Sequence, residues 1–183
     1  MGALGNLTPR LRGSFWTPMC EADLPAVNSL SSRLHPRHPE RDEIFIERFR
    51  LFPAGAFVFW GAGDVRGYCI SYPWLPRRVT PLDTLIGAIP KDACVLYLHD
   101  VGVEPNARCA NAIPDLFRRL IGLAKEHNLV SITGVAVNGT ERFWRRFGSE
   151  PDLSLDACDA SYGDASQYMS VPIARLSEQL ASH

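Results

Sequence analysis

The sequence has no cysteine pair at CxxC spacing, no long apolar run, no strong net charge and no internal repeat. Its five cysteines are odd in number and widely spaced, so neither a disulfide framework nor a zinc site is expected. Because no apolar run approaches the length of a bilayer span, we expect no membrane-spanning protein. The formal net charge of −1 gives no electrostatic reason to expect nucleic acid or an anionic membrane as partner. The first residues also lack the apolar core of a signal peptide, so we expect a cytoplasmic protein.

The composition is that of an ordinary globular protein, with 46% hydrophobic and 21% charged residues in a chain of 183. This length suits one domain, which we place at residues 15–183 after a loose leader at 1–14. Apolar periodicity and turn residues predict helices at 21–34, from Glu40 or Asp42 onward, and at 81–88, 116–127, 140–147 and 174–181. They predict strands at 15–19, 55–60, 65–72, 94–103, 130–137 and 168–173. The strand–helix–strand run from 94 to 137 is a βαβ unit, so we expect an α/β fold with a mixed central sheet and flanking helices.

The connection after the most apolar strand is the segment best suited to bind an anion. It reads VEPNARCANAIPDL, from Val103 to Leu116. Pro114 suits the first turn of a helix, and a helix N-terminus offers unpaired N–H groups and a partial positive charge to phosphate. Arg108 would add a full charge and a bidentate grip. The alternative interpretation is an ordinary βα loop.

The same segment resembles the core motif of the GNAT superfamily of acyl-CoA-dependent N-acyltransferases. That motif is a strand ending in V-x-P, then R/Q-x-x-G-x-G/A, then a long helix. Here LYLHDVGVEPNAR resembles the strand and its arginine, and DLFRRLIGLAKEHNL resembles the helix. Upstream, GAFVFWGAGDVRGYCISYPW resembles the family's hairpin, and downstream SITGVAVNGTERFWRRFG resembles its next strand, turn and aromatic helix. The resemblance spans roughly residues 15–173 and implies a GNAT-like fold with acetyl-CoA as co-substrate and no metal.

The resemblance also implies roles for single residues. The pantetheine arm would contact backbone groups near a strand bulge, at Val101, Gly102 and Val103, and would be reached by Asn138. The pyrophosphate would accept N–H groups from the loop residues Arg108, Cys109, Ala110, Asn111, Ala112 and Ile113. Phe143 and Trp144 would lie beside the thioester. Asn111 and Ile113 replace the two glycines of the family motif. Trp144 occupies the position where the family often has a tyrosine that acts as general acid and protonates the departing thiolate.

Two polar residues of the central strand are the candidate general bases that would deprotonate an amine. His99 and Asp100 are adjacent, so strict alternation puts them on opposite faces and lets one face a cleft. The alternative is that Asp100 accepts loop N–H groups and that His99 is a satisfied core residue. Glu40, within HPRHPE, is a further carboxylate candidate, with a solvated loop as the alternative. A metal site at His35, His38 and Glu40 is not expected, because no fourth ligand follows at suitable spacing.

The function implied by the resemblance is transfer of an acetyl group from acetyl-CoA to an unidentified amine by direct attack. The acceptor would be a small molecule or a peptide, with no nucleic acid and no membrane as partner. A homodimer could form through the last strand. The alternative is a catalytically impaired GNAT-fold module for binding or regulation, with or without acyl-CoA. The replaced glycines and Trp144 favour this alternative.

Overall fold

The computed structural model describes residues 13–137, 139–152 and 159–182, so most of the predicted leader lies outside the described residues. A seven-stranded sheet with the order β1-β2-β3-β4-β5-β7-β6 forms its centre. Its strands are β1 (Phe15–Pro18), β2 (Ala56–Gly61), β3 (Asp64–Trp74), β4 (Val95–Val103), β5 (Ser131–Ala136), β6 (Glu150–Pro151) and β7 (Gln167–Pro172). β4 and β5 are parallel and the other neighbours antiparallel, which confirms the predicted mixed sheet. The last strand, β7, is not outermost, because β6 lies beyond it.

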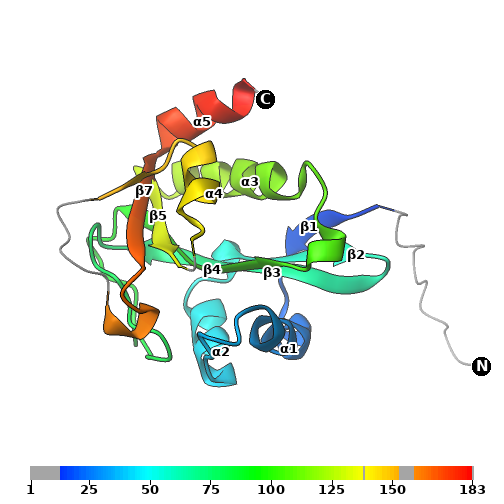
Figure 1. Ribbon diagram of the computed structural model, residues 1–183. Helices are drawn as coiled ribbons and strands as arrows, with labels where there is room; N and C mark the ends of the chain where they lie inside the picture. Colours follow the sequence, from blue (N-terminus) through cyan, green and yellow to red (C-terminus); the bar gives the residue numbers. More distant parts are fainter. Residues whose placement is uncertain (1–12, 138, 153–158, 183) are drawn as a thin grey trace, which may run out of the picture.

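Helices cover both faces of this sheet (Figure 1). Below it in that view lie α1 (Leu24–Leu34) and α2 (Asp42–Leu51), and above it lie α3 (Ala112–Glu126), α4 (Glu141–Arg146) and α5 (Ile173–Ala181). The longest, α3, buries Leu116, Leu120 and Ala124 at the spacing of one helical face. This arrangement confirms the predicted α/β class. Among the described residues, no helix combines the length and apolarity needed to cross a bilayer.

Alternate residues of β4 feed two hydrophobic clusters, one on each face of the sheet. Leu96 and Leu98 pack in the cluster with Phe117 of α3. Tyr97 packs in the other cluster, with Val27 of α1. This alternation is expected for a central strand covered on both sides.

The connection from β3 to β4, residues 75–94, is a long covering loop rather than the helix predicted at 81–88. That prediction is wrong because the backbone turns left-handed at Asp83 (φ 54°) and at Gly87 (φ 73°), which an α-helix does not allow. The loop is held by side chains of the α1–α2 region. Arg41 contacts the Asp83 carboxylate, and Glu47 accepts the N–H groups of Ile86 and Gly87.

The parallel strands β4 and β5 separate before they end. They pair only from Val95 to Leu98 on β4 and from Ser131 to Gly134 on β5. β4 then continues to Val103 and β5 to Ala136 without pairing to each other. Trp144 of α4 packs on Gly134 at this point, where a Cβ would lie 2.9 Å from Leu98 O and from the Trp144 ring. The gap between the strands opens a way through the sheet.

Candidate active site

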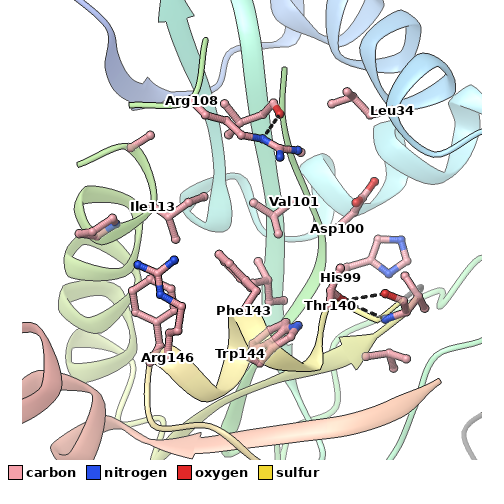
Figure 2. A pocket seen from close by; sticks show the side chains of 18 of the residues that line it. Leu34, His99, Asp100, Val101, Arg108, Ile113, Thr140, Phe143, Trp144 and Arg146 are labelled. Atoms are coloured by element: carbon pink, nitrogen blue, oxygen red, sulfur yellow. Dashed lines mark hydrogen bonds between the residues drawn. The ribbon is translucent and has the colours of Figure 1, made fainter. Parts of the chain in front are cut away.

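A cavity of about 770 Å³ occupies the gap between β4 and β5. Ile113 and Phe143, which pack against the α3-side cluster, line it together with Leu34 and Val135, which pack against the α1-side cluster. The cavity therefore crosses from one face of the sheet to the other. In Figure 2, Ile113 and Arg146 lie on the left, beside α3, and Leu34 lies on the right.

Every candidate residue of the sequence analysis that the structure describes lines this one cavity, and Asn138 lies outside the described residues. The lining residues are His99, Asp100, Val101, Gly102, Val103, Arg108, Cys109, Ala110, Asn111, Ala112, Ile113, Phe143 and Trp144. The tertiary structure therefore gathers β4, the loop after it and α4 around one space. The roles given to these residues stay predictions.

The α3 end of the cavity is basic. Arg108, Arg118 and Arg146 line it, and the first turn of α3 opens onto it. Arg108 is held by a hydrogen bond from its Nε to the Val103 carbonyl oxygen, 3.1 Å long. Trp16 of β1 fixes the start of α3, because its indole N–H donates to the Ala112 carbonyl oxygen at 2.5 Å. Pro114 has no N–H, and the Ala112 and Asp115 N–H groups already donate to Cys109 and Asn111 carbonyl oxygens, so the arginines and the positive end of the α3 dipole are what would attract an anionic group here.

The two residues that replace the motif glycines adopt ordinary right-handed backbone. Asn111 is the N-cap of α3 with φ −94° and ψ −7°. Ile113 belongs to the helix, and its partly buried side chain packs against the α3-side core. Neither residue is among those with positive φ, so this loop needs no glycine for its conformation. The side chain of Ile113 points into the core and cavity wall, where it adds apolar surface.

A β-bulge determines how the two candidate bases are placed. Ile70 of β3 pairs with Asp100 and the next residue, Ser71, pairs with Leu98, so His99 is the extra residue of β4. Both side chains consequently lie on the α1 side: His99 beside Tyr72, and Asp100 bonded to Ser31. The prediction that they face opposite sides is therefore wrong. Strict alternation holds only where the pairing is regular.

His99 and Glu40 form a buried pair. Nε2 of His99 lies 2.9 Å from Oε2 of Glu40, and the two side chains are 1% and 3% exposed. The other carboxylate oxygen accepts the N–H of Asp83 at 2.9 Å. Burial acts to raise the pKa of Glu40, but the charge and hydrogen bond of His99 and the Asp83 N–H outweigh it, so the pKa is lowered. Glu40 is therefore ionised at neutral pH.

An ionised carboxylate can only accept, so Nε2 is the nitrogen of His99 that carries the proton towards Glu40. The charged ring, which lowers the pKa of Glu40, carries a proton on Nδ1 as well; once that proton is lost, Nδ1 holds a free lone pair. This Nδ1 is buried and has no hydrogen-bond partner among the described residues. A histidine oriented by a carboxylate, with its second nitrogen unpartnered, is a candidate general base.

Asp100 lies in a second polar group beside this pair. Its Oδ2 accepts the Tyr68 hydroxyl at 2.6 Å and the Ser31 hydroxyl at 3.4 Å, and its Oδ1 lies 3.3 Å from Nε2 of His35. Burial and the Asp100 carboxylate both raise the pKa of Tyr68, so the phenol stays protonated and donates. Asp100 thus receives side-chain donors rather than the loop N–H groups considered as its alternative role.

Glu40 is the residue that sequence reasoning underrated, because a charged residue in a Pro- and His-rich loop is usually solvated. The covering loop buries Glu40 against His99, and the local sequence HPRHPE does not predict that long-range contact. The neighbouring histidines were a signal of a polar cluster, and His35 and His38 do line the cavity. Within the described part of the chain, no group of three or more His, Cys, Asp or Glu side chains is placed to hold a metal ion.

No protein-family model matches the sequence, and no curated protein matches it either. Solved structures do match the fold. A GNAT-like decarboxylase, GphF, in complex with isobutyryl-CoA superposes with a TM-score of 0.67 at 15% identity, over 87% of this chain and 99% of that one. The ribosomal-protein-S18-alanine N-acetyltransferase of Escherichia coli superposes with a TM-score of 0.62 at 14% identity, over 88% and 94%.

A third match is Arabidopsis thaliana Naa50 in complex with a bisubstrate analogue, CoA-Ac-MVNAL. Its TM-score is 0.61 at 14% identity, over 86% of this chain and 97% of that one. Likeness at this level of identity establishes the architecture alone. The chain therefore has the GNAT fold, as the resemblance in its sequence predicted.

Proposed function

We propose that the protein is an N-acyltransferase that moves an acetyl group from acetyl-CoA to an amine. The observation that carries the proposal is the buried Glu40–His99 pair. Both residues line the cavity between the separated strands, and His99 Nδ1 has no hydrogen-bond partner among the described residues. Amine acylation needs a base at this point, because an ammonium ion has no lone pair with which to attack.

The α3 side of the cavity suits coenzyme A. The pyrophosphate would lie on the first turn of α3, with Arg108 and Arg146 as counter-charges. The pantetheine arm would run through the gap, where Val101 to Val103 have left β5 and can bond a ligand through their backbone groups on that edge. The right-handed backbone at Asn111 and Ile113 supports this placement, since the loop reaches its conformation without the family's glycines.

The acceptor would enter from the α1 side. His99 Nδ1 would take a proton from the amine, whose nitrogen attacks the thioester carbonyl carbon. A tetrahedral intermediate forms, and a backbone N–H near Val103 would stabilise its oxyanion. The carbon–sulfur bond then breaks, and the thiolate leaves and takes up a proton. The products are the acetylated amine and coenzyme A with a free thiol.

The fold does not determine the reaction, since a GNAT-like decarboxylase and N-acetyltransferases share it. The assignment to acyl transfer therefore rests on the Glu40–His99 pair. A second candidate, acyl-CoA binding without turnover, is favoured by Trp144. This buried residue occupies the position where many family members have a tyrosine that acts as general acid, and its indole cannot protonate a thiolate at neutral pH.

Calorimetry with acetyl-CoA and with desulfo-CoA tests the binding half of the proposal. Micromolar binding is expected for both ligands. If neither binds at millimolar concentration, both candidate functions are wrong. Thiol release with a panel of amines then tests turnover: release that depends on the amine supports the transferase, whereas tight binding without release supports the module.

A further inference from the structure

The two ends of the cavity carry opposite charge. Among the described residues that line it, the arginines are Arg118 of α3, Arg146 of α4 and Arg108 of the loop that leads from β4 to α3. Both carboxylates, Glu40 and Asp100, lie at the α1 end, together with His35, His38 and His99. The basic end suits the phosphates of coenzyme A. The acidic end, which is the acceptor end in our proposed function, suits a cation.

Asp100 is oriented in advance to receive such a cation. Two neutral hydroxyl donors, Tyr68 and Ser31, occupy its Oδ2. Oδ1 faces His35 at 3.3 Å and has capacity for a further donor. The side chain is 16% exposed, so an ammonium ion there would be partly desolvated and its attraction to Asp100 correspondingly stronger than at the open surface.

The acceptor end is also covered. The covering loop (residues 75–94) places its Asp83 N–H on Glu40, and Leu82 of the same loop lines the cavity. Arg41 in turn holds the Asp83 carboxylate at 3.0 Å. The covered His99 and Glu40 side chains are almost inaccessible to solvent, at 1% and 3% exposure. A short, narrow acceptor fits such a place better than a folded protein surface.

We infer that the acceptor is a small diamine or polyamine, of which one nitrogen is acetylated while a second, as ammonium, pairs with Asp100. This inference rests on the proposed function. An α-amino acid is disfavoured, because its carboxylate would lie beside the Glu40 and Asp100 carboxylates, which repel it. The Glu40 and Asp100 carboxylates and the covering loop together favour a short acceptor that lacks a carboxylate.

Three acceptors built on the same four-carbon amine chain test this inference: 1,4-diaminobutane, butylamine and ornithine. Ornithine is diaminobutane with an added carboxylate, and butylamine lacks the second nitrogen. With acetyl-CoA as donor and thiol release as readout, we expect kcat/KM for diaminobutane to exceed that for butylamine by about tenfold or more, which is about 1.4 kcal/mol. Ornithine should fall at or below butylamine. An equal or higher kcat/KM for ornithine, or for a peptide N-terminus, overturns the inference.

Substitution of the proposed cation partner provides a second readout. Asp100→Asn keeps an oxygen that can accept from Tyr68 but removes the charge. The kcat/KM for diaminobutane divided by that for butylamine should therefore fall towards one, while the KM for acetyl-CoA is unchanged. Glu21→Gln is the matched control, because it also turns a carboxylate into an amide at a side chain that is 67% exposed and paired with Arg50. A ratio that persists in Asp100→Asn refutes the role of Asp100.

Different results would refute acetyl transfer itself and the choice of a diamine as acceptor. If acetyl-CoA does not bind, or if no amine releases thiol, the proposed function is wrong and the diamine inference falls with it. If thiol is released with ornithine or peptide but not with diaminobutane, the transferase stands and only the diamine inference is wrong.

Discussion

Replacement of His99 by alanine is the sharpest test of the site. A positioned general base contributes about 10²–10⁴ to a rate, so we expect kcat to fall by that factor, or by about 2.7–5.4 kcal/mol of transition-state stabilisation. Acetyl-CoA binding should stay within about twofold of wild type, because His99 packs beside Tyr72 in the α1-side cluster, whereas the proposed pyrophosphate site is at the start of α3 on the other face. Thiol release would give kcat, and calorimetry would give the dissociation constant of acetyl-CoA.

A merely structural histidine would behave differently in two measurements. First, the loss in His99→Ala should shrink as the acceptor amine becomes less basic or the pH rises, because more of the acceptor is then already deprotonated. Second, Glu40→Gln should lose less than His99→Ala, since the amide oxygen can still accept from Nε2 of His99. A loss in kcat below about fivefold, or one independent of pH and of amine basicity, would refute the general-base assignment.

Three further predictions concern the anion site, the strand gap and the buried pair. Arg108→Ala should weaken acetyl-CoA binding by about 1.5–3 kcal/mol in calorimetry, the range for a hydrogen bond to a charged group, and an unchanged affinity would contradict a phosphate contact. Gly134→Ala should lower the free energy of unfolding by about 1–3 kcal/mol in urea, because its Cβ would meet backbone and indole atoms at 2.9 Å. The control, Gly122→Ala in α3, has open space at its Cβ and should raise that free energy by about 0.5–1 kcal/mol. The folded-state pKa of Glu40 is lowered, so its stabilisation is complete above the ordinary value of 4.5 and is lost as the pH falls through the folded pKa. Urea titrations at pH 7 and pH 3 give the free energy of unfolding at each pH. We expect this free energy to fall less between pH 7 and pH 3 in Glu40→Gln than in wild type, and equal falls would contradict the ionised pair.

The sequence by itself determined the class of fold and indicated the segment that we propose as the anion site. Apolar periodicity identified β4 and α3, because a strand buried on both faces and an amphipathic helix leave distinct repeats over ten or more residues. The motif after β4 was readable because a strand, a loop and a helix N-terminus are contiguous in the chain. Both features depend on residues that are close together in the chain, so the sequence pattern alone can indicate them.

The tertiary structure alone decided which polar groups meet on the α1 side of the cavity. The bulge at His99 depends on the pairing register of β4 with β3, which a single strand does not reveal, and it turned His99 and Asp100 to the same face. The burial of Glu40 depends on a loop more than forty residues further along the chain, whose Asp83 N–H meets its carboxylate. A lone histidine in a central strand could be a base or a core residue. Its contact with an ionised, solvent-excluded carboxylate is the observation on which we base the proposal that it is a base, and that contact exists only once distant segments have packed together.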